Sequence, residues 1–424
     1  MTASSDDSKT RGGNPPSGAG VLDLVGLDRA DDLAPGILRL LEEADVIAGP
    51  ARWLDELEGF PAEKLPLSGG LDAWLRELET RSRSLRCVAL ASGDPNFYGL
   101  ARKLLTVVPP ERTVIRPSTT TVQKAFARMK ETWAGAEVVS LHGRDGWAAL
   151  FSALFRAGRP GAAGRVAVYT DPSSTPGEIA RRATGRGCSG SWSMTVFEDL
   201  DAPGERVTAL SLEEAAAREF SALNLAVLLL ARPPAPLSLG LPESAYEHEA
   251  GLITKSEIRS AALGTLGLCG HETLWDIGAG SGSVSVEAGL LLPRGAVWAV
   301  EREEARAGQA RANRARYGCC HVEILRGEAL ELIPSLPDPD RVFIGGSGKD
   351  LEAVIAAARA RLSPGGTITA SVVTHGSLGA AARALSGPGG PPSVLQISCS
   401  RSRELSGSFY FTPLNQVYLV TNAF

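Results

Sequence analysis

The stretch Trp275-Asp276-Ile277-Gly278-Ala279-Gly280-Ser281-Gly282-Ser283 decides the fold of the second half of this chain. Residues 274–277 are an apolar run that predicts a buried strand, and an apolar-periodic helix pattern begins near Val284. Three alternating glycines lie between them, in the strand–turn–helix context that gives a glycine motif its meaning. Glycine lets the backbone turn tightly and approach a ligand closely, and the new helix N-terminus offers free N–H groups. The stretch therefore predicts a ligand-binding loop at the end of a strand.

Two further strand ends extend this pattern. Residues 297–301 predict a strand that ends in an acid, and residues 322–325 a strand that is followed by Gly327-Glu328-Ala329. This order resembles the motifs of Rossmann-like class I methyltransferases, which use S-adenosylmethionine. The resemblance implies that Glu301 accepts the ribose hydroxyls, that Glu328 and Ala329 flank the adenine, and that the cofactor loop is formed by Asp276, Gly278, Ala279, Gly280, Ser281 and Gly282. We expect Asp276 to fix this loop. The alternative, a glycine-rich turn with two surface acids, leaves the ordered set of three strand ends unexplained.

Length and composition bound the class of protein. A chain of 424 residues is too long for one ordinary core, so we expect two or three domains. The net charge of -5 gives no electrostatic argument for nucleic acid or an anionic membrane as partner. Residues 1–20 are polar without an apolar core, which predicts a disordered tail and neither a signal peptide nor a membrane span. The six cysteines form no C-x-x-C or zinc-spaced cluster. We therefore expect a cytoplasmic protein with reduced thiols and no metal site.

The chain divides at a proline-rich segment. Strand and helix signals alternate from residue 21 to residue 230, which predicts a mostly parallel α/β domain. The segment Arg232-Pro233-Pro234-Ala235-Pro236 lacks most of its backbone donors and predicts a linker. We therefore expect one domain over residues 21–236 and a second α/β domain over residues 237–424. The second should have a mostly parallel sheet that ends in an antiparallel strand pair at residues 394–399 and 417–421.

The first domain carries a different set of motifs. Ala91-Ser92-Gly93-Asp94-Pro95 with Phe97-Tyr98-Gly99, and Pro117-Ser118-Thr119-Thr120-Thr121, are similar to elements of the tetrapyrrole methylase family. The resemblance implies a two-lobed domain that holds S-adenosylmethionine between its lobes, through Gly93, Asp94, Phe97, Thr120 and Thr121. One departure is visible, because Gly26-Leu27-Asp28-Arg29-Ala30 keeps a single glycine of the family's G-x-G-P-G loop. That loop faces the substrate cleft in the family.

The order of the two domains narrows the resemblance. A tetrapyrrole methylase domain followed by Gly251-Leu252-Ile253-Thr254-Lys255-Ser256-Glu257-Ile258-Arg259 and the glycine loop resembles the decarboxylating precorrin-6Y methyltransferase family of cobalamin synthesis, over residues 21–424. The resemblance implies methylation at carbons 5 and 15 of the tetrapyrrole, with loss of carbon dioxide from the ring C acetate. It also implies that Thr254 contacts the cofactor. Since such a substrate carries many carboxylates, we predict carboxylate-binding roles for Lys255, Arg259, Gly346 and Ser347. The alternatives are a solvated helix face for the first two and a packing turn for the other two.

Two other functions stay open from the sequence alone. The second half could be a single-activity methyltransferase for a tetrapyrrole, a protein or RNA, although no basic stripe favours RNA. The first half, with its altered opening loop, could serve as a scaffold or regulator. We also expect a homo-oligomer. No proton donor for decarboxylation is identified, because His142 is predicted to be structural and the other histidines are isolated in the sequence.

Overall fold

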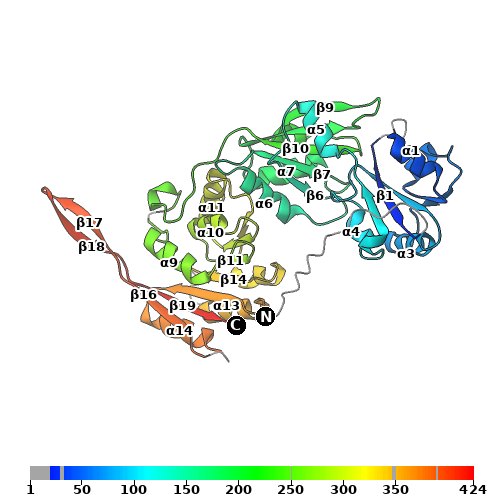
Figure 1. Cartoon of the computed structure of the whole chain (residues 1–424). Helices are drawn as coiled ribbons and strands as arrows, with labels where there is room; N and C mark the ends of the chain where they lie inside the picture. The colour runs from blue at the N-terminus through cyan, green and yellow to red at the C-terminus, as the bar shows by residue number, and fades with distance from the viewer. Residues whose placement is uncertain (1–19, 29–32, 250, 346–349, 388–389) are drawn as a thin grey trace, which may run out of the picture. The chain divides into compact units, whose positions relative to one another are not determined.

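The computed structural model describes residues 20–28, 33–249, 251–345, 350–387 and 390–424 (Figure 1). The chain forms two compact units, Met1–Trp133 and Ala134–Phe424. Apart from Gly20, the predicted N-terminal tail lies outside the described residues.

The first unit is a parallel sheet between two helical layers. Its strand order is β3-β2-β4-β1-β5, and every pair is parallel. Successive residues of β1 point to opposite faces, so that Leu24 joins a core with α3 and α4, whereas Val25 joins a core with α1 and α2. Burial on both faces explains why these strands are continuous apolar runs in the sequence. The elements are β1 Leu22–Leu27, α1 Pro35–Glu42, β2 Val46–Gly49, α2 Ala51–Glu56, β3 Glu63–Pro66, α3 Leu71–Ser82, β4 Cys87–Ser92, α4 Ala101–Leu104, β5 Thr113–Arg116 and α5 Thr121–Met129.

The second unit begins with a mixed sheet of order β6-β7-β10-β8-β9. Only β6 and β7 pair in parallel, and the pairs β7–β10, β10–β8 and β8–β9 are antiparallel. The prediction of a mostly parallel domain is therefore correct for the first unit and wrong for this sheet. Antiparallel pairing follows for β8 and β9 because the turn of residues 199–205 is too short for a parallel crossover. The elements are β6 Glu137–Ser140, α6 Trp147–Ala157, β7 Arg165–Tyr169, α7 Pro176–Gly185, β8 Trp192–Glu198, β9 Arg206–Ser211, α8 Leu212–Ala216 and β10 Asn224–Leu230.

A seven-stranded sheet of order β13-β12-β11-β14-β15-β19-β16 completes the second unit. The first five strands are parallel and β19 is antiparallel to β15 and β16, which confirms the predicted antiparallel edge. Helices α9, α10 and α11 pack on one face, and α13 and α14 on the other. Because the strand order reverses between β11 and β14, the carboxyl ends of these two strands form the position where open α/β sheets bind ligands. The elements are α9 Ser256–Leu266, β11 Thr273–Ile277, α10 Ser283–Leu291, β12 Ala296–Glu301, α11 Glu304–Arg316, β13 Val322–Arg326, α12 Ala329–Leu332, β14 Arg341–Ile344, α13 Leu351–Arg361, β15 Thr367–Val372, α14 His375–Leu385, β16 Ser393–Ile397 and β19 Val417–Ala423.

The two sheets of the second unit share one hydrophobic core, which includes Phe155 of α6 and Val322 of β13. The ring of Phe155 packs against His321, with 4.1 Å between ring centroids. Polar contacts surround this packing: Arg186 forms an ion pair with Glu323, and the guanidinium of Arg314 donates to the carbonyl of Gly185 over 2.8 Å.

The predicted linker is itself held in place, since the N–H of Ala235 donates to the carbonyl of Arg316 over 2.9 Å.

A hairpin of two strands, β17 Ser400–Leu405 and β18 Ser408–Pro413, projects beyond β16 and β19 (Figure 1). Its base is fixed by Arg401, whose guanidinium nitrogens lie 2.7 Å from Glu243 and 2.6 Å from Glu257. Its outer part exposes 72% of Phe409 and 70% of Phe411. Among the described helices, none combines the length and the hydropathy needed to cross a membrane.

Candidate active site

The glycine loop after β11 adopts the backbone conformation that its sequence predicts. Gly278, Gly280 and Gly282 have φ values of 77°, 57° and 74°, a region that side-chain-bearing residues rarely adopt. The N–H of Gly278 donates to the carbonyl of Val300 over 2.9 Å, which ties the loop to the end of β12. A Cβ atom on Gly282 would lie 2.9 Å from the Cβ of Ala310, whereas a Cβ on Gly280 would enter open space. Gly282 is thus required for packing, and Gly280 lines the site.

Asp276 lies beneath this loop and is 1% exposed. Its Oδ2 accepts a hydrogen bond from the hydroxyl of Ser285, in the first turn of α10. Within the described structure its Oδ1 has no partner. Burial raises the pKa of Asp276 to about 7, with Ser285 opposing the rise and the charge of Glu301 adding to it. Asp276 therefore anchors the helix that follows the loop, and it acts on the loop through that helix.

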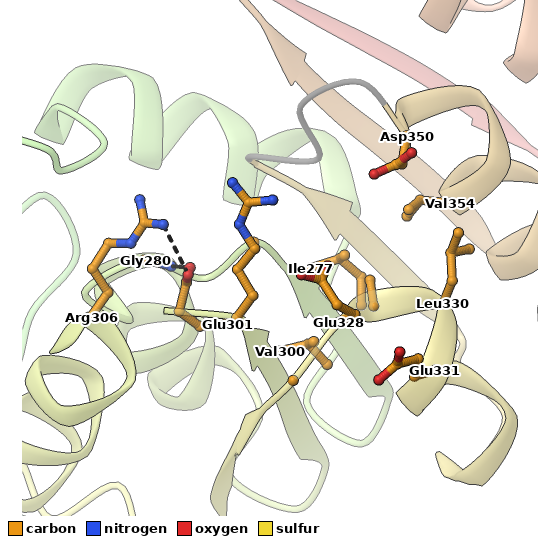
Figure 2. Close-up of a pocket in the computed structure, with 14 residues that line it drawn as sticks. Ile277, Gly280, Val300, Glu301, Arg306, Glu328, Leu330, Glu331, Asp350 and Val354 are labelled. Atoms are coloured by element: carbon orange, nitrogen blue, oxygen red, sulfur yellow. Dashed lines mark hydrogen bonds and ion pairs between the residues drawn. The ribbon is translucent and has the colours of Figure 1, made fainter. Parts of the chain in front are cut away.

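Glu301, at the end of β12, is the carboxylate that contacts the loop directly. One of its oxygens accepts from the N–H of Gly280 over 2.8 Å, and the other accepts from the N–H of Glu303 over 3.0 Å. The guanidinium of Arg306 lies 3.2 Å from the second oxygen. A dashed line in Figure 2 marks this ion pair. Glu301 is 4% exposed. A carboxylate has about four acceptor positions, so these contacts leave capacity for the hydroxyls of a ligand.

The loop and Glu301 open into a cavity of about 430 Å³ at the carboxyl ends of β11, β12 and β13. Glu301 and Arg306 stand on one side of it, and Asp350, Val354 and Leu330 on the other (Figure 2). The predicted residues Gly278, Gly280, Glu301, Glu328 and Ala329 are brought together here. The cavity is further lined by Ile277, Val300, Arg302, Arg306, Gly327, Leu330, Glu331, Asp350 and Val354.

Most of these additional residues escaped the sequence prediction. Arg302 and Arg306 follow Glu301 closely in the sequence. The position of Arg306 at the start of α11 is the signal that could have suggested its ion pair with Glu301. Asp350 and Val354 come from the start of α13, and the sequence analysis gives neither of them a role. The lining combines apolar side chains, such as Ile277, Leu330 and Val354, with charged groups on both sides of the cavity (Figure 2). Apolar surface of this kind suits a flat ring, and the charged groups suit vicinal hydroxyls.

Arg259, in the first turn of α9, departs from its predicted role because its side chain is fully buried. Its guanidinium lies 2.8 Å from Glu287, which is also fully buried, and donates to the carbonyl of Thr254 over 2.7 Å. Glu287 accepts two N–H groups, from Gly240 and Leu241, over 3.0 and 3.1 Å. These groups satisfy one another, so a substrate carboxylate has no access to Arg259. Its predicted role is therefore replaced by a structural one.

The other predicted residues of this half lie beside the cavity or outside the described chain. Thr254 and Lys255 are half-buried before α9 and do not line the cavity. Ala279, Ser281 and Asp276 do not line the cavity either, and Ser281 is 2% exposed. Gly346 and Ser347 lie outside the described residues. Across the described residues, no group of three or more metal-ligating side chains could hold a metal ion.

The first unit brings its own predicted residues to the carboxyl edge of its sheet. A Cβ on Gly26 would lie 1.9 Å from the carbonyl oxygen of Gly93 and 2.9 Å from the backbone nitrogen of Ser118. The N–H of Gly93 donates to the carbonyl of Leu27 over 2.8 Å. Three loops meet at Gly26, and no side chain would fit between them. Gly26, the glycine that the opening loop retains, is therefore required at this position.

Some side chains near the point where these loops meet form hydrogen bonds within their own loops. Asp94 Oδ1 accepts from the N–H of Asn96 over 2.9 Å. The hydroxyl of Thr120 caps α5 by accepting from the N–H of Gln123 over 3.1 Å. Phe97 and Thr121 are half-buried nearby in sequence. In place of a further glycine, the altered loop carries Asp28, which forms an ion pair with Lys124.

In the seven-stranded sheet, a glycine loop with positive φ values follows the first strand, β11, and an acid ends the next strand, β12. Together with the parallel strand order, these features define a Rossmann-like methyltransferase domain. Comparison with known proteins agrees. The family described as "Precorrin methyltransferase domain" matches residues 244–422, and the family described as "Tetrapyrrole (Corrin/Porphyrin) Methylases" matches residues 25–216. The chain belongs to the precorrin-6Y C(5,15)-methyltransferase (decarboxylating) family, as its similarity to a member from Sinorhizobium sp shows. That relative is 31% identical over 360 residues, which are 82% of this chain and 83% of the relative.

Two further comparisons concern shorter proteins. A probable cobalt-precorrin-6B C(15)-methyltransferase (decarboxylating) from Pyrobaculum calidifontis is 40% identical over 185 residues, 43% of this chain and 94% of the relative. The crystal structure of a precorrin-6Y C5,15-methyltransferase from Geobacter metallireducens GS-15 is 36% identical, with a TM-score of 0.41. It covers 43% of this chain and 96% of that chain.

Proposed function

We propose that this protein methylates precorrin-6Y at carbons 5 and 15 and removes carbon dioxide from the ring C acetate, with S-adenosylmethionine as methyl donor. The observation that carries the proposal is that both family matches occur in one chain. The same chain aligns with a single relative over 83% of that relative's length. A single-activity enzyme with an inert first half would need neither the motifs nor the loop convergence of the first unit.

The cavity of the second unit fits S-adenosylmethionine by the chemistry of its donors. Glu301 would accept the ribose hydroxyls and the backbone of Gly280 would border the methionine part. Ile277, Leu330 and Val354 would enclose the adenine. When bound, this molecule supplies a methyl group on a positively charged sulfur. The chain's own task is to hold donor and acceptor in line, which can lower a barrier by ~7–11 kcal/mol.

The proposal divides the work between the two domains. Residues 237–424 would methylate carbon 15 and decarboxylate, and residues 21–236 would methylate carbon 5 through Gly93, Asp94, Phe97, Thr120 and Thr121. Thr254 remains a proposed cofactor contact. For the carboxylates of the substrate we retain Lys255, Gly346 and Ser347. Lys255 is supported by its half-buried position at the start of α9 and by its charge, which lowers the pKa of Glu243 together with the stronger effect of Arg401.

The direct test is incubation of the full chain with precorrin-6Y and S-adenosylmethionine, followed by mass spectrometry. We expect a product with two added methyl groups that has lost one carbon dioxide. If the full-length protein adds only one methyl group, the alternative in which the first domain is a scaffold would be favoured. The absence of any methylated tetrapyrrole would refute the proposal.

We also propose that the protein acts in the cytoplasm and self-associates through the hairpin β17–β18. An isolated two-stranded hairpin is marginally stable in water, and both of its edges are available for pairing. Large exposed rings such as Phe409 and Phe411 on such an element are typical of a contact with another chain. A second copy of the same hairpin offers matching strand edges, so we propose a homo-oligomer built on this element.

A further inference from the structure

His375 is an exposed histidine at the carboxyl edge of the seven-stranded sheet. It is the first residue of α14, directly after β15. Its Nε2 lies 3.2 Å from the hydroxyl of Tyr418. Within the described part of the chain, no hydrogen bond to its Nδ1 is found. A histidine that is fixed through one ring nitrogen and open at the other is arranged to exchange a proton with a ligand.

Tyr418 is a rigid support for this histidine. It lies in β19 opposite Val372, the last residue of β15, and is only 7% exposed. Its ring belongs to the core beneath α13 and α14. The neighbouring hydroxyl at this edge, that of Thr374, is committed to the cap of α14 through the N–H of Ser377. His375 is therefore the residue of this loop that is both held in place and able to meet a ligand.

The position of His375 relative to the cavity follows from the topology. Helices α13 and α14 follow the adjacent parallel strands β14 and β15 and pack against each other, so both begin at the same edge of the sheet. Asp350, the residue at the start of α13, lines the cavity. Packed helices lie ~8–10 Å apart, which places His375 about one helix width beyond the cavity wall. Because the strand order is β12-β11-β14-β15, this is the side away from Glu301. A large flat acceptor that faces the cavity would extend over this edge.

We propose that His375 donates the proton that replaces the carboxylate lost from the ring C acetate, with Tyr418 as its positioning residue. This inference rests on the proposed function. In the decarboxylation, the bond between the acetate methylene and its carboxylate breaks, carbon dioxide leaves, and the electron pair passes into the methylated macrocycle. This cleavage stays reversible until the methylene carbon takes a proton from the His375 imidazolium, so protonation controls the net release of carbon dioxide. Solvent restores the proton at the exposed ring. In sum, one carboxylate and one proton become carbon dioxide and a methyl group.

The test compares His375→Asn with a matched control in the full chain. His271 is also exposed and lies just before β11, at the opposite edge of the same sheet, so His271→Asn removes an imidazole without touching the site. Each variant is incubated with precorrin-6Y and S-adenosylmethionine. Mass spectrometry gives the ratio of methylated product that has lost carbon dioxide to methylated product that retains the carboxylate. Absorbance titration with the tetrapyrrole, in the presence of S-adenosylhomocysteine, reports substrate affinity.

A general acid typically contributes about 10²–10⁴-fold, so His375→Asn should slow carbon dioxide release about a hundredfold or more. Methylation and tetrapyrrole affinity should stay within about twofold of the wild type, and a methylated, carboxylated product should accumulate. Tyr418→Phe should shift the same product ratio by a smaller factor, about tenfold, at unchanged affinity.

The inference is overturned if carbon dioxide release by His375→Asn keeps pace with methylation. It is equally overturned if tetrapyrrole affinity is what falls, or if methylation and decarboxylation decline together. When the wild type itself forms no methylated and decarboxylated product, the proposed function fails, and that outcome is recognised before any variant is compared.

Discussion

Replacing Glu301 by alanine removes three contacts at once from the glycine loop of the second unit. The N–H of Gly280 loses an acceptor at 2.8 Å, the N–H of Glu303 loses one at 3.0 Å, and Arg306 loses its nearest carboxylate. If the cavity binds S-adenosylmethionine as we propose, the ribose hydroxyls lose their acceptor as well. The fold itself should tolerate the change, because the backbone contact between Gly278 and Val300 still ties the loop to β12.

The size of the effect follows from the charged hydrogen bonds. A hydrogen bond to a charged group contributes ~1.5–3 kcal/mol, and about 1.4 kcal/mol corresponds to tenfold in affinity. Glu301→Ala should therefore weaken binding of the cofactor product, S-adenosylhomocysteine, roughly ten- to a hundredfold at this site. Glu303→Ala is the matched control, since it removes a carboxylate two residues away that is exposed and accepts no loop N–H.

The assay is calorimetric titration of the full chain with S-adenosylhomocysteine. The proposed site of the first domain is present in every sample and serves as an internal reference, so only one of the two binding phases should weaken. An unchanged isotherm for Glu301→Ala would refute the assignment of Glu301. An equal loss in Glu303→Ala would show that net charge, and no specific contact, determines the affinity.

Three further predictions concern Gly280, Asp276 and the hairpin β17–β18. Gly280 lines the cavity, and a side chain at this position would enter open space, so Gly280→Arg should fill the cavity and abolish decarboxylation. Mass spectrometry should still detect methylation at carbon 5. Normal carbon dioxide release would contradict the proposed division of labour between the two domains. Because the pKa of Asp276 rises from 3.8 to about 7 on folding, the folded state keeps a proton that the unfolded chain has lost, so stability should fall as pH rises through this range. Asp276→Asn should flatten that part of the melting-temperature profile, and an unaltered profile would contradict the assignment. Replacing Phe409 and Phe411 by serine should lower the oligomeric state seen by light scattering, and an unchanged mass would exclude the hairpin as the contact.

The parts of the site that the sequence predicted are those encoded within a few consecutive residues. The loop of Gly278, Gly280 and Gly282 needs positive φ values at alternating positions, and only glycine adopts them without strain. The strand that ends in Glu301 is recognisable because burial on both faces makes it a continuous apolar run. Local backbone requirements therefore explain why the three strand ends were placed correctly.

The residues that the sequence placed wrongly or missed depend on partners far along the chain. Arg259 was predicted as a substrate contact from its position at a helix start, but its partner Glu287 lies on the next helix. The sequence contains no local sign that these two side chains will face each other. Asp350 reaches the cavity only because α13 packs beside α12, and His375 meets Tyr418 only because β19 returns to pair with β15. Tertiary packing, which no local pattern encodes, selects all of these contacts.

The two family matches lie on either side of residue 236, yet this point is not a boundary in packing. Residues 134–424 form one compact unit, and its core passes from α6 to β13. Burial between these elements lowers the pKa of His321 to about 4, so the ring stays neutral against Phe155.

Strand β13 leads directly to Gly327 and Glu328 of the cavity, and the Arg186–Glu323 ion pair holds that strand from the side of the first sheet. Cutting the chain at 236 would expose this core and leave Glu323 without its arginine. The architecture of the cavity proposed as the second cofactor site thus includes structure from the first family match. For this reason, binding and turnover have to be measured on the full chain.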